Sequence, residues 1–173
     1  MEALLAGVCV HVIGQVGELF SKCAGRFDGY YRNPEKTAEA LHGEWFTAGD
    51  LGMKDDENYF YIVDRKTDMI ISGGENIYPR EIEDVLKFHP AVSDCAVFGV
   101  PDERWGEAVK ALIVLKTGNV VSAEEISQHC GKHLAGYKRP KFISFVEDLP
   151  RTSSGKVMKK QIRDEYWTGK EKV

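Results

Sequence analysis

The order of elements in this chain is decided by residues 64–79, which read DRKTDMIISGGENIYP. The residues just before them, 59–63, form an apolar and aromatic run that predicts a strand, and the stretch itself opens with a charged cluster. A β-branched run then leads to Gly73-Gly74, where two residues without a Cβ allow a tight turn or the close approach of another molecule. Pro79 suits the first turn of a helix, where its missing N–H costs nothing. We therefore expect a strand, a charged joint, a hairpin with a glycine tip and a helix, with a boundary between two bodies here and a ligand nearby.

The patterns on the two sides of this boundary differ. Residues 51–63 are typical of a hairpin with its turn at 54–58, and the apolar run 1–13 is typical of a strand. Beyond the boundary, helical and strand patterns alternate. Helices are expected at 80–88 and 161–167, and a third helix is expected to begin at a capping box formed by Ser122 and Glu125. Strands are expected at 92–100, 109–115 and 142–146, with a loop at 101–106. The sequence thus predicts an α+β fold with three parts: a β-rich region at 1–65, a small mixed-sheet domain with helices at 66–167, and a tail at 168–173.

Composition and charge narrow the function. A net charge of -4 without a dominant basic field gives a nucleic-acid partner little electrostatic support. Two late basic clusters, 138–141 and 156–160, suit either a phosphate ligand or a solvated face. The four cysteines are scattered singly, so we expect no metal site and a reducing compartment. Residues 1–13 lack a basic leader and are too short to span a bilayer, so the expected location is the cytoplasm, without a transmembrane segment.

Two opposite charges stand at the mouth of the predicted hairpin. Counting back from its turn brings Asp50 and Arg65 to the same open end, a few residues out of register. The pair could form a plain salt bridge. Alternatively, the two side chains share a ligand, because an ionised carboxylate accepts hydrogen bonds from two donors.

A second chemical signal lies near the end of the chain, where residues 149–157 read LPRTSSGKV. A phosphate-binding loop of the Walker type is excluded by spacing, since Pro150 stands where its first glycine belongs and Val157 where its hydroxyl belongs. On a bare Gly-Lys loop, Lys156 would most simply be an exposed lysine. A catalytic cation is the other interpretation.

Taken together, these motifs resemble adenylate-forming enzymes, and acyl-CoA synthetases in particular. In that family the pattern runs Asp-Arg-x-Lys-Asp-x-Ile, then Gly-x-x-Ile-x-Pro-x-Glu-Ile-Glu, and closes with Pro-x-x-x-x-Gly-Lys. This chain matches at Asp64-Arg65, Asp68, Ile70, Gly74, Ile77, Pro79, 81–83, Pro150 and Gly155-Lys156. Thr67 departs from the family, which usually carries a hinge Lys or Asp there.

The resemblance implies a role for each motif. The family's equivalent of Asp50 accepts hydrogen bonds from both ribose hydroxyls of the nucleotide, and the equivalent of Arg65 donates to the same ribose. Lys156 would neutralise the acyl carboxylate and the α-phosphate as the mixed anhydride forms.

The resemblance also implies that one domain is used twice. Lys66 and Thr67 would form the hinge about which it rotates. After the rotation, a loop of Gly73, Gly74 and Glu75 would line the channel for the thiol of CoA. The expected substrates are ATP (released as AMP), CoA and a fatty or other hydrophobic carboxylic acid, with Mg²⁺ in the full-length enzyme.

The resemblance covers nearly all of this chain but only about the last third of the family's length. The triphosphate loop and the acyl pocket are not among these residues, so we expect an acyl-CoA synthetase (AMP-forming) of which this chain alone is inactive. Two alternatives stay open: the lid of another adenylating enzyme, which transfers its acyl group to a carrier protein or to oxygen, and a non-catalytic module that binds a nucleotide or CoA. The oligomeric state stays open as well.

Overall fold

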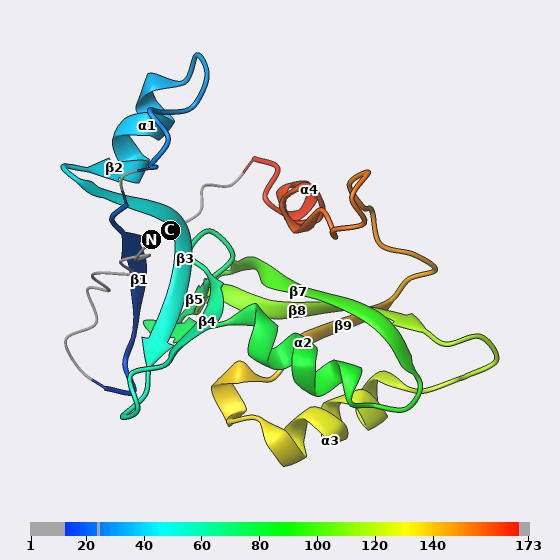
Figure 1. Ribbon diagram of the computed structural model, residues 1–173. Helices are drawn as coiled ribbons and strands as arrows, with labels where there is room; N and C mark the ends of the chain where they lie inside the picture. The colour runs from blue at the N-terminus through cyan, green and yellow to red at the C-terminus, as the bar shows by residue number, and fades with distance from the viewer. Residues whose placement is uncertain (1–12, 24, 170–173) are drawn as a thin grey trace. The chain divides into compact units, whose positions relative to one another are not determined.

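The computed structural model describes residues 13–23 and 25–169, which divide into two compact units (Figure 1). The first unit ends at Thr67 and the second begins at Asp68. This division falls two residues beyond the 65/66 boundary drawn from the sequence. The strand expected in residues 1–13 lies almost wholly outside the described residues.

The first unit is an antiparallel sheet built around one long strand. This strand, β3 (Trp45–Lys54), pairs with β1 (Val16–Ser21) along one edge and with β2 (Leu41–His42) and β4 (Phe60–Arg65) along the other. A short helix, α1 (Pro34–Ala40), precedes β2; Asn33 caps it by accepting a 3.0 Å hydrogen bond from the Lys36 amide. A side chain at this cap satisfies a backbone N–H that the helix itself leaves without a partner.

The register of the β3–β4 hairpin differs from the expected one. Asp50 and Arg65 are direct partners across the two strands, not a few residues apart. Two causes add up: Lys54 pairs with Phe60, so the turn lies further along the chain than 54–58, and a bulge between Leu51 and Gly52 takes up one more residue of β4. A bulge shifts every partner beyond it by one position.

The second unit contains a five-stranded mixed sheet. Its strands are β5 (Ile70–Ser72), β6 (Glu75–Ile77), β7 (Val92–Asp102), β8 (Gly106–Leu115) and β9 (Phe142–Phe145). All pairs are antiparallel except β8–β9, which is parallel. The β7–β8 pair extends from Val92 opposite Leu115 to Asp102 opposite Gly106, so the expected loop at 101–106 is shorter than predicted. Pro101 is accommodated in β7, opposite Glu107.

Helices cover both faces of this sheet (Figure 1). One face carries α2 (Pro79–Lys87) and α3 (Ala123–His133), and the other carries α4 (Lys159–Tyr166); a 3₁₀ turn, η1 (Gly136–Lys138), follows α3. Strand β8 contributes Val109, Ala111 and Ile113 to the core on the first face, and Ala108 and Leu112 to the core on the second. A central strand covered on both faces, as expected for 109–115, is confirmed, and so is the α+β class.

Two further expectations concern caps and cysteines. The capping box is confirmed: Ser122 Oγ accepts from the Glu125 amide at 3.2 Å, and the Glu125 carboxylate accepts from the Ser122 amide at 2.8 Å. Cys95 and Cys130 are buried core residues, and Cys23 is exposed, while Cys9 lies outside the described residues. Burial raises the pKa of Cys95 to about 12, so this thiol is unreactive at neutral pH. None of the helices in 13–23 and 25–169 is long and apolar enough to cross a membrane.

Candidate active site

Asp50 and Arg65 meet in the first unit, at the end of the β3–β4 hairpin. Arg65 Nε lies 3.2 Å from Asp50 Oδ1, with the arginine side chain 62% and the aspartate side chain 26% exposed. The ion pair uses one carboxylate oxygen and one guanidinium nitrogen. The second carboxylate oxygen and the two terminal guanidinium nitrogens lie outside this contact, so the pair combines acceptor and donor groups at one exposed place.

Lys66 is attached to the first unit through both its main chain and its side chain. Its amide donates to Gly49 O at 2.8 Å, and its ammonium lies 2.7 Å from Glu18 Oε2 on β1. Glu18 also accepts from the Thr47 hydroxyl at 2.9 Å. Burial raises the pKa of Glu18, but the hydrogen bonds from Lys66 and Thr47 outweigh burial and hold that pKa below its usual value. Of the two expected hinge residues, Lys66 is therefore fixed within the first unit, and the boundary follows Thr67.

Gly73 and Gly74 form the two-residue tip of the β5–β6 hairpin, between the paired residues Ser72 and Glu75. Both glycines have positive φ, +59° and +85°, as a two-residue hairpin turn of the primed type requires. Gly73 donates its amide to Trp105 O at 2.9 Å, and a Cβ on Gly73 would lie only 2.7 Å from the Trp105 ring. The glycine tip predicted from the sequence is confirmed, and Gly73 is additionally needed for this close packing.

A cavity of about 470 Å³ borders this hairpin. Its lining includes Trp105, Tyr137, Arg139 and Lys141 besides residues of the glycine loop. Lys141 Nζ lies 2.5 Å from Asp102 Oδ2, and this contact is the main reason why the pKa of Asp102 is lowered. The sequence showed the basic residues only as a cluster at 138–141, without indicating that Trp105 and the glycine loop lie beside them.

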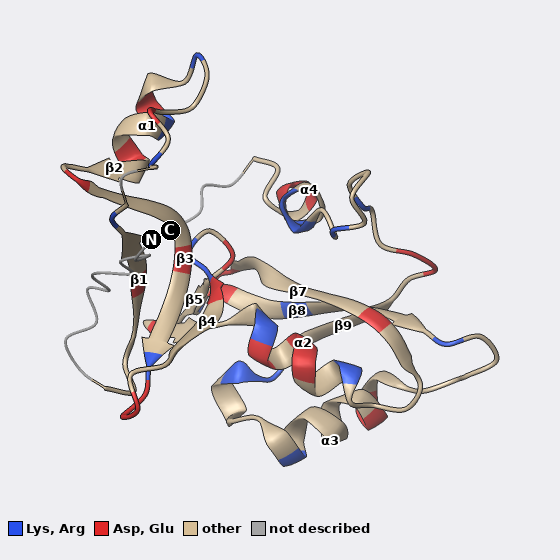
Figure 2. Ribbon diagram, viewed as in Figure 1, with Lys and Arg blue, Asp and Glu red and all other residues tan. Residues whose placement is uncertain are grey.

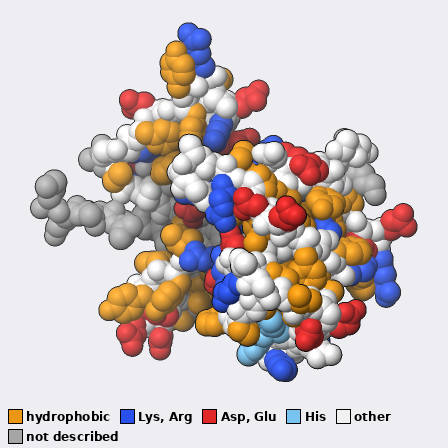
Figure 3. Space-filling model, turned by 90° about the vertical axis from the view of Figure 1, so that its right-hand side faces the viewer, with side chains coloured by type: hydrophobic (Ala, Val, Ile, Leu, Met, Phe, Trp, Pro, Cys, Tyr) orange, Lys and Arg blue, Asp and Glu red, His pale blue; other side chains and the backbone are white. Residues whose placement is uncertain are grey.

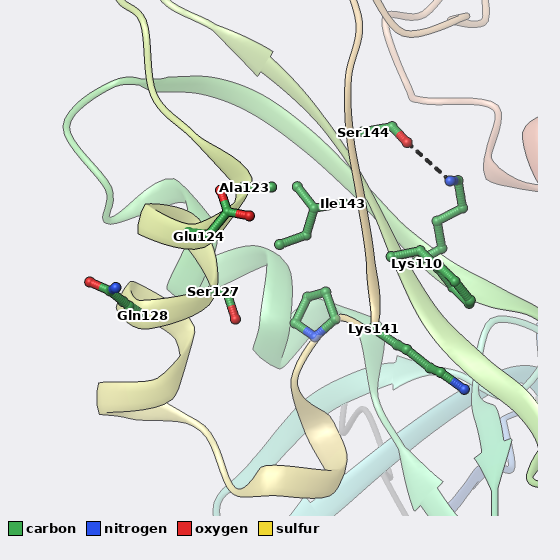
Figure 4. Close-up of a pocket in the computed structure, with 10 residues that line it drawn as sticks. Lys110, Ala123, Glu124, Ser127, Gln128, Lys141, Ile143 and Ser144 are labelled. Atoms are coloured by element: carbon green, nitrogen blue, oxygen red, sulfur yellow. Dashed lines mark hydrogen bonds between the residues drawn. The ribbon is translucent and has the colours of Figure 1, made fainter.

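A second cavity, of about 570 Å³, lies between the start of α3 and β9 (Figure 4). In Figure 4, Ile143 points toward α3, whereas Lys110 and Ser144 point away from it and are joined by a 3.1 Å hydrogen bond. Burial lowers the pKa of Lys110. Apart from Pro140 and Lys141, which border both cavities, the residues of the glycine loop and its neighbouring cavity do not line this one.

Lys156 is exposed on a tight loop that precedes α4. The loop is closed by a β-bridge between Arg151 and Val157, and the Thr152 amide donates to Lys156 O at 2.8 Å. Gly155 adopts a φ of +83° immediately before the lysine. A backbone conformation that only glycine adopts readily therefore sets the direction in which the Lys156 side chain leaves the loop.

The lysine loop (residues 151–157) and the glycine hairpin tip (Gly73 and Gly74) lie at opposite ends of the β7–β8 pair. Arg151 of the lysine loop contacts Asp94 near the start of β7, whereas Gly73 contacts Trp105 where the β7–β8 hairpin turns. Asp94 and Asp102 are eight positions apart on β7, which at the usual rise per residue is roughly 26 Å. The structure thus unites Asp50 with Arg65 but separates Lys156 from Gly73, Gly74 and Glu75. Figure 2 shows acidic and basic residues interspersed on α2 and α4 around these loops.

Part of the sequence matches a known protein family. Residues 81–156 match the AMP-binding enzyme C-terminal domain. They belong to that family. The matched residues extend from α2 to Lys156 and therefore include both ends of the β7–β8 pair.

Relatives extend the similarity to most of the chain. It is 46% identical to a feruloyl-CoA synthase from Amycolatopsis sp over 153 residues, covering 88% of this chain and 31% of that protein. It is 48% identical to the long-chain-fatty-acid–CoA ligase FadD13 from Mycobacterium tuberculosis over 150 residues, covering 87% and 30%. The solved o-succinylbenzoate CoA synthetase MenE from Bacillus subtilis, in complex with its acyl-adenylate intermediate, matches with a TM-score of 0.82 at 38% identity, covering 88% and 31%. The chain therefore spans about a third of the length of these relatives.

Proposed function

We propose that this chain forms the C-terminal part of an ATP-dependent carboxylic acid–CoA ligase. The reaction has two steps: the carboxylate attacks the α-phosphate of ATP to give an acyl-adenylate and pyrophosphate, and the thiol of CoA then displaces AMP to give the thioester. Support comes from the relatives, which include two acid–CoA ligases and a CoA synthetase solved with an acyl-adenylate.

The observation that carries the proposal is the separation of the lysine loop and the glycine hairpin within one unit. Adenylation brings two anions together, and an exposed ammonium on a flexible stem stabilises the charge that develops between them. Thioester formation does not bring two anions together in this way, because the carboxylate is then part of a mixed anhydride, whose acyl carbon the thiol attacks as AMP leaves. One unit that carries a cation at one end and a close-packed glycine hairpin at the other suits a reaction whose two steps make different demands.

Asp50 and Arg65 are the proposed ribose-binding pair. An ionised aspartate accepts from two hydroxyl groups, and the terminal nitrogens of Arg65 donate to the same sugar. Binding a ribose requires the ion pair only to open slightly, since both side chains are already at one exposed place.

CoA is the proposed acceptor because of the cavity beside the glycine hairpin. CoA carries several phosphates and an adenine, and the cavity offers Arg139 and Lys141 for the former and the rings of Trp105 and Tyr137 for the latter. Gly73, Gly74 and Glu75 would lie along the path of the thiol. A carrier-protein acceptor would not need an aromatic and basic cavity of this kind, and a non-catalytic module would not need Lys156.

The proposal extends to the hinge, the acid, the metal ion and the location. Lys66 is held in the first unit by Gly49 and Glu18, so the rotation would take place at Thr67. A hydrophobic acid, such as the fatty or aromatic acids of the two curated relatives, is the proposed substrate, and the cytoplasm the proposed location. Among the described residues no group of three or more His, Cys, Asp or Glu side chains could hold a metal ion, so we assign no step to the Mg²⁺ that accompanies ATP.

A fusion enzyme tests this function. In it, the present chain replaces the corresponding segment of FadD13, and pyrophosphate, AMP and acyl-CoA are measured with a long-chain fatty acid. We expect all three products in equal amounts, and no pyrophosphate from the 173-residue chain alone. Pyrophosphate without acyl-CoA would contradict CoA as the acceptor. A properly folded fusion that releases no pyrophosphate would contradict the proposed adenylation.

A further inference from the structure

The lysine loop is held by one arginine. Arg151 donates through one terminal nitrogen to Gly155 O at 2.8 Å, and through the other to the carboxylate of Asp94 on β7. Gly155 is the residue immediately before Lys156. The Arg151 guanidinium therefore links the Gly155 carbonyl of the loop to Asp94 of strand β7.

Both ends of this contact are supported. Asp94 also lies 3.6 Å from Lys87 of α2, and its carboxylate accepts from the Cys95 amide at 2.9 Å. At the base of the loop, the Met158 amide donates to Pro150 O at 2.8 Å. Lys159, the first residue of α4, forms a 2.7 Å ion pair with Glu83 of α2, which is 7% exposed. The base of the loop is thus fixed from two sides, while Lys156 at its crest is exposed.

A glycine next to an exposed lysine would otherwise leave the lysine poorly directed. Glycine has more backbone freedom than any other residue, and a lysine side chain has many rotamers. A group misplaced by about 1 Å costs roughly 100-fold in rate, so a contact that fixes the Gly155 carbonyl acts on rate far more than on stability. The ion pair itself is partly exposed and contributes little to folding.

We infer that Arg151 and Asp94 are positioning residues that direct Lys156 during adenylation. This inference rests on the proposed function, because it assigns to the pair an effect exerted only through Lys156. Arginine is required for the role, since its planar fork reaches two acceptors at once, whereas a lysine in its place reaches only one.

The test uses the fusion enzyme with the two half-reactions measured separately. Arg151→Lys and Asp94→Asn are each expected to lower kcat for adenylation by about 10- to 100-fold. KM for ATP and the rate of thioester formation from supplied acyl-adenylate should stay unchanged. The matched control is Asp164→Asn, which removes the exposed Lys160–Asp164 pair of α4 and should leave both steps unchanged. In a Lys156→Ala background, Arg151→Lys should cause no further loss.

A second measurement follows the loop without any activity. In the 173-residue chain, Arg151→Lys and Asp94→Asn should speed hydrogen exchange of the Thr152 and Gly155 amides, whose bonds close the loop. The amides of β8, and those of β7 other than the Cys95 amide that Asp94 accepts from, should exchange as in the unmodified chain.

The outcomes separate this inference from the proposed function. If Lys156→Ala leaves adenylation intact, the proposed function fails. If Lys156→Ala slows adenylation but the Arg151 and Asp94 variants do not, only the positioning role fails. Equal losses in both half-reactions, or additive losses in the Lys156→Ala background, would also overturn the positioning role.

Discussion

At the scale of single residues, Asp50 and Arg65 combine an ion pair with spare donors and acceptors. The two interpretations of this pair differ in what they demand of the carboxylate. A salt bridge needs only its charge, whereas a ribose needs two strong acceptors at one place.

Asp50→Asn distinguishes these interpretations, because the amide keeps the size of the side chain and loses its charge. A hydrogen bond to a charged group contributes about 1.5–3 kcal/mol, so KM for ATP in the fusion enzyme should rise roughly 10- to 100-fold. Asp56→Asn, in the turn of the same hairpin, is the control. An unchanged KM for ATP would leave Asp50 as part of a salt bridge only.

A second residue-scale prediction concerns three neighbouring histidines of the second unit. The rings of His89 and His129, and of His129 and His133, have centroids 5.1 and 5.2 Å apart, and Figure 3 shows histidine side chains gathered at one place on the surface. His89 Nδ1 accepts from the Ala91 amide at 3.3 Å, which requires an unprotonated nitrogen. Burial and His129 lower the pKa of His89, with a smaller contribution from Lys116, against the opposing effect of Glu125.

Because its folded-state pKa lies below its unfolded value of about 6.5, His89 favours the folded state only while it is neutral. The free energy of unfolding should therefore be largest above about pH 6.5 and should fall as the pH drops through the folded-state pKa of His89. His89→Gln should reduce this dependence, as measured by urea unfolding at pH 7.5 and pH 5.5. An equal loss on acidification in both proteins would show that other groups cause it.

At the scale of elements, the β5–β6 hairpin depends on two glycines for different reasons. Both have a positive φ, so an alanine at either position costs roughly 1–2 kcal/mol. Only Gly73 also packs against Trp105, whereas a Cβ on Gly74 would meet open space. Gly73→Ala should thus lower the melting temperature more than Gly74→Ala, and Trp105→Leu should remove most of the difference. Equal melting temperatures for the two alanine variants would argue against the tight packing.

Local signals in the sequence were sufficient for several elements. The capping box of Ser122 and the glycine tip each depend on residues close together in the chain, and both are confirmed. The predicted register of Asp50 and Arg65 was wrong for two reasons: the turn lies further along the chain than 54–58, and the bulge beside Leu51 leaves little trace in an apolar pattern. The extent of β7 was underestimated because Pro101, normally a strand breaker, is accommodated opposite Glu107.

The sequence likewise indicated some residues of the candidate site but not the residues that they contact. Lys156 and the glycine loop stand in continuous motifs, so the sequence indicated them directly. The partners of these loops come from distant parts of the chain: Asp94 lies 57 positions from Arg151, and Glu18 lies 48 from Lys66. Such contacts depend on how the sheets are assembled, and no local pattern reports them.

At the scale of the whole molecule, the chain passes from the first unit to the second after Thr67, and the preceding residue, Lys66, is held in the first unit. Lys66 is held by Gly49 and Glu18, so the proposed rotation would use the backbone of Thr67 and the residues after it. Thr67→Pro fixes φ near −65° and should therefore favour one orientation. In the fusion enzyme it should spare one half-reaction and slow the other at least about 10-fold. Both half-reactions at unmodified rates would place the pivot elsewhere.

In the proposed function, one unit acts in two steps through loops at its opposite ends. A single-turnover measurement of both half-reactions in the fusion enzyme carrying Lys156→Ala tests this division of roles. Removing a charge that stabilises only the first transition state should slow acyl-adenylate formation about 100- to 1000-fold, while thioester formation from supplied acyl-adenylate and CoA continues at the unmodified rate. Equal losses in the two half-reactions, or no loss in the first, would contradict the account.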